Sequence, residues 1–203
     1  MGWNDYMEAA MTITRDSLMT LEAYAKARSA MREQVMAQKK LRRIALGEHI
    51  LLIFENELLI RYQIQEMLRV EKIFEEDGIQ HELESYVPLV PTGSNFKVTM
   101  QIEYADEEQR RVMLGKLKGV EDRVWVRVDG FDPVFAIADE DLERENEEKT
   151  SAVHFLRFEL STGMIAAARA GAALSVGDDH PACSANTGAL PEAVRASLAS
   201  DLC

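Results

Sequence analysis

The sequence predicts an α+β fold, with a mainly antiparallel sheet and flanking helices in a single domain. Three observations support this class. Apolar and polar residues alternate from Phe96 to Tyr104, which is the period of a strand with one buried face. Apolar residues recur at helical spacing from Leu18 to Val35. Helical and strand-like segments are interspersed without a regular βαβ repeat, which favours antiparallel pairing.

The composition is that of a protein with a normal core. Of the 203 residues, 47% are hydrophobic and 29% charged, which suits one domain. The longest aliphatic and aromatic run, Ile50 to Phe54, is far shorter than the roughly 20 residues of a membrane span. We find no secretory signal, and the two cysteines, Cys183 and Cys203, could bridge only a tail. We therefore expect a cytoplasmic protein with no membrane association.

The net charge of −12 predicts that phosphate backbones are repelled, so we expect no nucleic-acid partner.

The N-terminal half is expected to be mainly helical. Thr14 is the expected N-cap of a long helix that reaches about Lys40. Asn56 is expected to cap a second helix that runs to about residue 76 and is ended by Gly78. The other elements expected here are two paired strands at 44–46 and 50–54 and a short helix at 80–86.

The C-terminal half is expected to supply most strands. We predict strands at 96–104, 124–128, 134–138 and 152–160, helices at 106–118 and 162–170, and a short edge strand at 172–176. The turn at Asp129 and Gly130 is expected to join two of these strands as a hairpin. The densely charged stretch 139–149 is interpreted as a solvated helix.

Changes in composition divide the chain into three parts. Residues 1–13 form an N-terminal extension, residues 14–182 the core domain, and residues 183–203 an Ala/Ser-rich tail. Pro191 is a possible start for a short helix in this tail, because leucine and valine then recur four residues apart. The tail is interpreted as an appendage that can dock.

Two groups of residues are candidates for binding a ligand. On the second helix Arg61, Gln65 and Arg69 share one face beside Glu66, and arginine suits bidentate pairing with a carboxylate or phosphate. The alternative is that they form salt bridges with the protein's own carboxylates. In the loop before the 96–104 strand, Ser94 and Asn95 with Lys97 offer hydroxyl, amide and cationic groups to an anion; the alternative is an ordinary turn.

Two histidines complete the candidates. His154 shares a strand face with Leu156 and Phe158, so it is either a hydrogen-bonded core histidine or a ligand or general base. His180 follows Asp178 and Asp179 at the end of a strand, where a turn explains the same residues.

Motifs for common cofactors and metals are absent from the sequence. It has no dinucleotide or phosphate-binding glycine loop, no Cys-x-x-Cys and no His-Glu-x-x-His. The plausible metal ligands come from three separate segments: Glu66, His154, Asp178, Asp179 and His180. We therefore expect no cofactor and no stoichiometric transition metal.

One face of the predicted sheet mixes aromatic and basic residues: Trp125, Arg127, Phe155 and Arg157. Aromatic residues and arginine are enriched in protein interfaces, so Trp125 and Phe155 are hypothesised to anchor a partner or a second copy. The alternative is a solvated face with cross-strand ion pairs.

Three blocks of sequence, at 61–69, 91–95 and 148–158, resemble a bacterial family of unknown function, DUF3501. The resemblance covers about Ile13 to Ala182 and leaves the tail outside. It implies a bacterial protein whose gene neighbours encode rubrerythrin and an iron–sulfur oxidoreductase, and it supplies no catalytic residues. The function we expect is that of a non-catalytic accessory or ligand-binding component of an oxidative-stress or electron-transfer system. The alternative is a small enzyme, metal-dependent or not, with a site of histidine, carboxylate and arginine.

Overall fold

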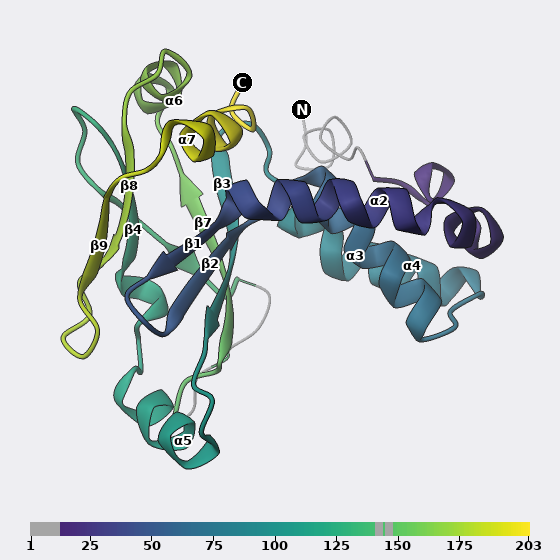
Figure 1. The fold of residues 1–203 in the computed structure, drawn as a ribbon, viewed down its shortest axis with the longest axis horizontal. Helices are drawn as coiled ribbons and strands as arrows, with labels where there is room; N and C mark the ends of the chain where they lie inside the picture. Colours follow the sequence, from purple (N-terminus) through teal and green to yellow (C-terminus); the bar gives the residue numbers. More distant parts are fainter. Residues whose placement is uncertain (1–12, 141–143, 145–147) are drawn as a thin grey trace. The chain divides into compact units, whose positions relative to one another are not determined.

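The computed structural model describes residues 13–140, 144 and 148–203, and Figure 1 shows its ribbon. The predicted α+β class with antiparallel strands is confirmed. Contacts group the chain into two compact units. The helical unit runs up to Lys40 and continues with Glu55–Thr92, and the sheet unit comprises Leu41–Phe54 and Gly93–Cys203. Of the expected extension 1–13, only Ile13 lies within the described residues, and it is buried in the core of the helical unit.

Helices build the helical unit. They are α2 (Leu21–Arg42), whose last two residues belong to the sheet unit, α3 (Glu57–Val70) and α4 (Glu76–Tyr86), with the 3-10 turns η1 (Arg15–Ser17) and η2 (Val87–Leu89). The apolar residues at helical spacing on α3 and α4 are buried together with Ile13 and Leu18. The members of this core are Ile13, Leu18, Ile60, Ile64, Leu68, Ile79 and Leu83.

The first long helix begins later than expected. Thr14 precedes the turn η1, and Leu18 then has an extended backbone, so the helix cannot run through this point. The helix α2 begins at Leu21, where the Thr20 hydroxyl accepts a hydrogen bond from the Ala23 backbone N–H at 3.2 Å. Thr20 therefore does the capping that was predicted for Thr14.

The second helix ends earlier than predicted, at Val70, and the short helix predicted at 80–86 is present as α4, which begins at Glu76. Asn56 caps α3 as expected, with its side chain accepting from the Leu59 N–H at 3.0 Å. The helix ends before Lys72, which has a positive φ of 54°. The Ile73 N–H then bonds back to the Leu68 carbonyl, and Ile73 packs against the unit's core. This apolar anchor ends the helix, whereas Gly78 lies inside α4.

Two antiparallel sheets build the other unit. The first has the order β1-β2-β3-β7-β6 and the second β5-β4-β8-β9. The strands of the first sheet are β1 (Arg43–Leu46), β2 (Ile50–Phe54), β3 (Asn95–Ile102), β6 (Ile137–Ala138) and β7 (Val153–Glu159). Those of the second are β4 (Val124–Val128), β5 (Val134–Phe135), β8 (Leu174–Asp178) and β9 (Ala185–Ala189). The remaining elements are α5 (Glu107–Lys116), η3 (Glu121–Arg123), α6 (Thr162–Arg169) and α7 (Glu192–Ala199).

The segment 134–138 joins the two sheets. Its first half pairs with β4, with Phe135 opposite Trp125, as the predicted hairpin requires. After Ala136 its second half pairs with β7, with Ile137 opposite Arg157. The inward residues of both sheets contribute to one hydrophobic core.

The strand β8 is central and not an edge strand. It pairs with β4 on one side and β9 on the other, and all five of its residues are buried. The prediction failed because the partner β9 is built from Ala185–Ala189, a stretch of small and polar residues with no apolar alternation.

The C-terminal residues are part of the sheet unit and not an appendage. The predicted tail helix is present as α7, and its Leu198 is buried in the core with Leu190 and Leu202. The Arg42 guanidinium, 1% exposed, also binds the Asp201 carboxylate at 2.7 and 2.8 Å. Burial of leucines at four-residue spacing explains why this segment docks.

Most of the charged stretch 139–149, predicted as a solvated helix, lies outside the described residues. At its beginning Glu140 binds Arg157 of β7. In the part of the chain that the structure describes, no helix is both long and apolar enough to cross a membrane.

Candidate functional site

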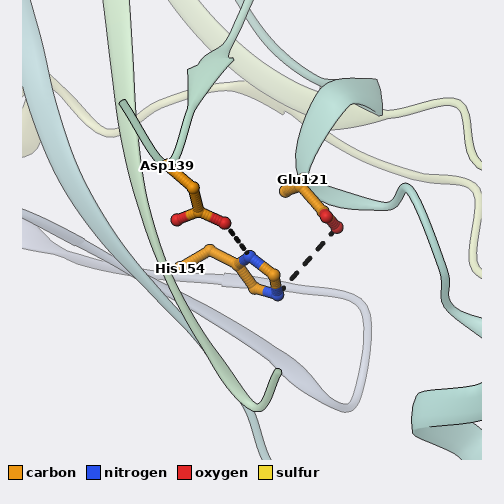
Figure 2. A group of neighbouring side chains, drawn as sticks. All are labelled: Glu121, Asp139 and His154. Carbon is orange, nitrogen blue, oxygen red and sulfur yellow. Dashed lines mark hydrogen bonds and ion pairs between the residues drawn. The ribbon is translucent and has the colours of Figure 1, made fainter. Parts of the chain in front are cut away.

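Three segments of the sheet unit bring His154, Asp139 and Glu121 together (Figure 2). His154 lies on β7 and is fully buried, on the inward face predicted for it. Asp139 directly follows β6, and Glu121, 7% exposed, begins the 3-10 turn η3. One ligand atom of each residue lies within 4.8 Å of the others. We call these three residues the His154 cluster.

Both nitrogens of the His154 ring face oxygen atoms. Nδ1 lies 2.6 Å from Asp139 Oδ2, and Nε2 lies 3.0 Å from both the Ser151 carbonyl oxygen and Thr150 Oγ1. Glu121 Oε2 lies 3.9 Å from the same Nε2. Nδ1–H donates to the Asp139 carboxylate, whereas the role of Nε2 depends on the tautomer: Nε2 donates to the Ser151 carbonyl oxygen or accepts from the Thr150 hydroxyl. A carboxylate thus stands at each end of the ring, as Figure 2 shows.

The carboxylate of Asp139 is held firmly. Its other oxygen, Oδ1, accepts from the Phe155 backbone N–H at 3.0 Å and from Arg144 at 3.3 Å. Arg144 in turn stacks 4.7 Å above the Phe155 ring. Asp139 also has a positive φ of 48°. Such backbone conformations are costly for residues other than glycine and persist where surrounding contacts enforce them.

His180 lies in a separate network. Its Nε2–H donates to the Lys118 carbonyl at 3.0 Å, and its Nδ1 accepts from the Ala182 N–H at 3.2 Å. Asp178 accepts from the His180 N–H and from the Cys183 thiol. Burial and this carboxylate raise the pKa of Cys183 to about 12, so the thiol stays protonated and is a poor nucleophile. These contacts stabilise the turn after β8. The Asp179 backbone N–H also donates to the Arg123 carbonyl oxygen.

The candidates on α3 bind other residues of the helical unit. Gln65 bonds both backbone groups of Met19, and Arg61 binds Glu57 and Ser17. Glu66 accepts from Arg28 at 2.7 and 2.9 Å.

Two more groups, Arg69 and the Tyr24 hydroxyl, also donate to Glu66. The Arg28 guanidinium, followed by Arg69 and Tyr24, holds the pKa of Glu66 well below its ordinary value against the opposing effect of burial. These contacts are salt bridges and hydrogen bonds within the protein, which was the alternative to ligand binding for this face of α3.

The loop candidates gather at one end of β3 and β7. Ser94 and Asn95 donate to Glu159 at 2.5 and 3.2 Å. Lys97 lies opposite Arg157 in the strand register, and burial and this neighbouring cation lower the pKa of Lys97. Arg157 is itself bound by Glu140 and Glu159, each at 2.8 Å. The basic groups that were expected to attract an anion therefore already lie beside carboxylates of the same chain.

The four partner-binding candidates lie on both sheets, with the segment 134–138 between them. Trp125 and Arg127 are on β4, where the guanidinium lies 5.7 Å from the Trp125 ring centre. Phe155 and Arg157 are on β7.

Two exposed residues of the segment 134–138 lie opposite one member of each pair. Phe135, 44% exposed, stands opposite Trp125, and Ile137, 42% exposed, stands opposite Arg157. Opposite residues of an antiparallel pair share a face. We call Trp125, Phe135, Ile137 and Arg157 the outer band. In the sequence, Phe135 and Ile137 are the two largest side chains of the segment 134–138 and lie two residues apart, which places them on one face of a strand.

A shallow recess of about 530 Å³ adjoins the outer band at Phe135. The side chains around it include Lys118, Arg123, Asp122 and His180. Two cations against one carboxylate give this recess an excess of positive charge in a chain of net charge −12. It suits an anionic group of a binding partner.

Comparisons with known proteins agree with the sequence resemblance. Residues 12–202 match the family model described as "Protein of unknown function (DUF3501)", so the match includes the C-terminal segment that we expected to lie outside it. A crystal structure of a novel protein of unknown function from Burkholderia pseudomallei is similar, with 60% sequence identity and a TM-score of 0.90. The similarity covers 95% of this chain and 100% of that one. No curated protein matches.

Proposed function

This chain belongs to the DUF3501 family of proteins of unknown function, and from that premise we propose that it is a non-catalytic accessory component that binds a protein partner through the outer band. The exposed pair Phe135 and Ile137 carries the proposal, because these two large apolar side chains lie close together on the segment 134–138 and Phe135 lies opposite Trp125. Buried aromatic anchors supply most of the energy of protein interfaces.

The charge around the outer band indicates the kind of partner. Arg127 lies beside Trp125, and the recess at Phe135 carries Lys118 and Arg123. Two copies of a chain with net charge −12 repel each other, which disfavours self-association. The expected occupant is therefore a different protein that presents an apolar anchor flanked by acidic residues. The rubrerythrin and the iron–sulfur oxidoreductase associated with the family are the first candidates.

The enzyme alternative receives less support from the geometry. It combined His154, His180 or Glu66 with Arg61 and Arg69. Within the described residues, His154 and His180 have separate sets of hydrogen-bond partners, and Arg61 and Arg69 pair with Glu57 and Glu66 of their own helix.

The test measures binding of the purified chain to each purified candidate by calorimetry. We expect Phe135→Ser to weaken binding at least tenfold. Phe74→Ser is the matched control, since Phe74 is 67% exposed but lies in the helical unit, and it should bind like the wild type. The affinity should increase at lower salt concentration, because salt screens the charges around the outer band. Equal binding by wild type and Phe135→Ser, or binding to neither candidate, would refute this assignment.

Light scattering on the same samples tests the second-copy alternative. We expect a monomer. A wild-type dimer that Phe135→Ser converts to monomer would assign the outer band to self-association instead.

A further inference from the structure

We propose that the His154 cluster holds one divalent transition-metal ion, with His154 Nε2 and the Glu121 carboxylate as side-chain ligands and Asp139 as the residue that orients the ring. This inference does not depend on the proposed partner surface. It assigns a role to a set of buried polar groups that the outer band does not use.

The oxygen atoms around Nε2 supply the first argument. Thr150 Oγ1 and the Ser151 carbonyl each lie 3.0 Å from Nε2, and Glu121 Oε2 lies 3.9 Å away. Thr150 Oγ1 is also 3.4 Å from Glu121 Oε2. Two atoms that each lie about 2.1 Å from one ion in a tetrahedral site are separated by about 3.4 Å. The observed separations are thus close to those of atoms that share one small cation.

The orientation of the ring supplies the second argument. A histidine that binds a metal through one nitrogen usually donates its other N–H to a carboxylate, which fixes the ring and its tautomer. Asp139 Oδ2 takes that position at 2.6 Å from Nδ1. The Phe155 N–H and Arg144 hold the second oxygen of Asp139, at a residue whose positive φ its contacts must enforce.

Charge and burial supply the third argument. Glu121 is 7% exposed and His154 fully buried, and the Asp139 side chain is 11% exposed. A divalent cation at this position would interact strongly with both carboxylates, since charges are weakly screened in a buried site. One imidazole nitrogen with three oxygens is a donor set that suits Zn²⁺, Mn²⁺ or Fe²⁺ better than a soft, thiolate-preferring ion.

The sequence pointed away from this site because its side-chain ligands come from η3 and β7 and its orienting residue from the end of β6. Our expectation that no metal is bound considered His154 only with Glu66, Asp178, Asp179 and His180.

The test is metal analysis of untagged protein, first as purified from cells supplied with zinc, manganese and iron, then after chelation and titration with Zn²⁺ or Mn²⁺. We expect about one ion per chain in the wild type. Glu121→Gln, which keeps the side-chain shape, should lose the ion, and Asp139→Asn should bind about 10- to 100-fold more weakly. His180→Gln, a change at another buried histidine of the same unit, is the matched control and should keep the ion.

A measurement on the wild type keeps the test decisive if a variant fails to fold. In protein with ¹⁵N-labelled histidine, Zn²⁺ should shift the Nε2 resonance of one histidine and leave its Nδ1 protonated. Absence of bound metal under all these conditions would overturn the proposal. So would metal that Glu121→Gln retains in full, or metal that shifts no buried histidine, since it would then be adventitious.

Discussion

At the scale of single residues, partly buried polar side chains are fixed by several partners at once. Glu66 is an example, because Arg28, Arg69 and Tyr24 all donate to its carboxylate. An ionised carboxylate with such donors is stabilised in the folded protein, and removal of one partner leaves the others unpaired. Glu66 therefore stabilises the packing of α2 against α3 within the helical unit.

This arrangement predicts a pH dependence. Because the pKa of Glu66 is lower in the folded protein than its ordinary value of 4.5, its stabilisation is complete above about pH 4.5 and is lost as the pH falls towards the folded pKa. Glu66→Gln should reduce the free energy of unfolding by about 1–3 kcal/mol at pH 7. Below pH 4.5 the free energy of unfolding of this variant should fall less steeply with falling pH than that of the wild type. Denaturant titrations followed by far-UV circular dichroism measure both. Glu71→Gln, at an exposed position, should behave like the wild type, and an unchanged acid slope in Glu66→Gln would contradict the prediction.

At the scale of elements, the ends of helices and the neighbours of strands depend on contacts distant in sequence. Local signals sufficed for β3, whose alternation is regular, and for the Asn56 cap of α3. They failed at the end of α3, where the packing of Ile73 decides, and at β8, whose partner β9 has no apolar alternation. The His154 cluster was missed for the same reason, because β6, β7 and η3 come together only in the folded chain.

The end of α3 gives a prediction at this scale. Lys72 has the left-handed backbone conformation that glycine adopts without steric cost. Lys72→Gly should therefore stabilise the protein by about 0.5–1 kcal/mol. Glu71→Gly, at a neighbour with ordinary helical φ, should instead destabilise by up to about 1 kcal/mol. Thermal unfolding of both variants measures the difference, and the same sign in both would show that the conformation of Lys72 is unimportant.

At the scale of the whole molecule, the C-terminal segment completes the sheet unit. It supplies β9 to the second sheet, three leucines to the core, and Asp201 to the buried Arg42. Burial of a leucine side chain contributes roughly 1.5–3 kcal/mol, and breaking a buried ion pair costs roughly 3–5 kcal/mol. Their sum is comparable with the total stability of about 5–15 kcal/mol of a typical domain.

Removal of residues 184–203 should therefore abolish the cooperative unfolding of the sheet unit. An appendage, as this segment was interpreted from the sequence, would instead leave a folded unit after its removal. Fluorescence of Trp125, which packs against Gly177 of β8, reports on this unit during denaturant titration. The double variant Phe135→Ser with Ile137→Ser, at exposed positions, is a control that should unfold cooperatively. A truncated chain with a wild-type transition would show that the segment is dispensable.

The position of β9 also affects how the protein folds during synthesis. The helical unit has all its residues once Thr92 has left the ribosome, whereas β8 acquires its second neighbour only after Ala189 has emerged. At ~5–20 residues per second, this leaves an interval on the order of ten seconds. During this interval the strands of the sheet unit are present on the nascent chain without β9 and α7 to cover them. The newly made chain is then most exposed to aggregation, and a chaperone would have its longest opportunity to bind it.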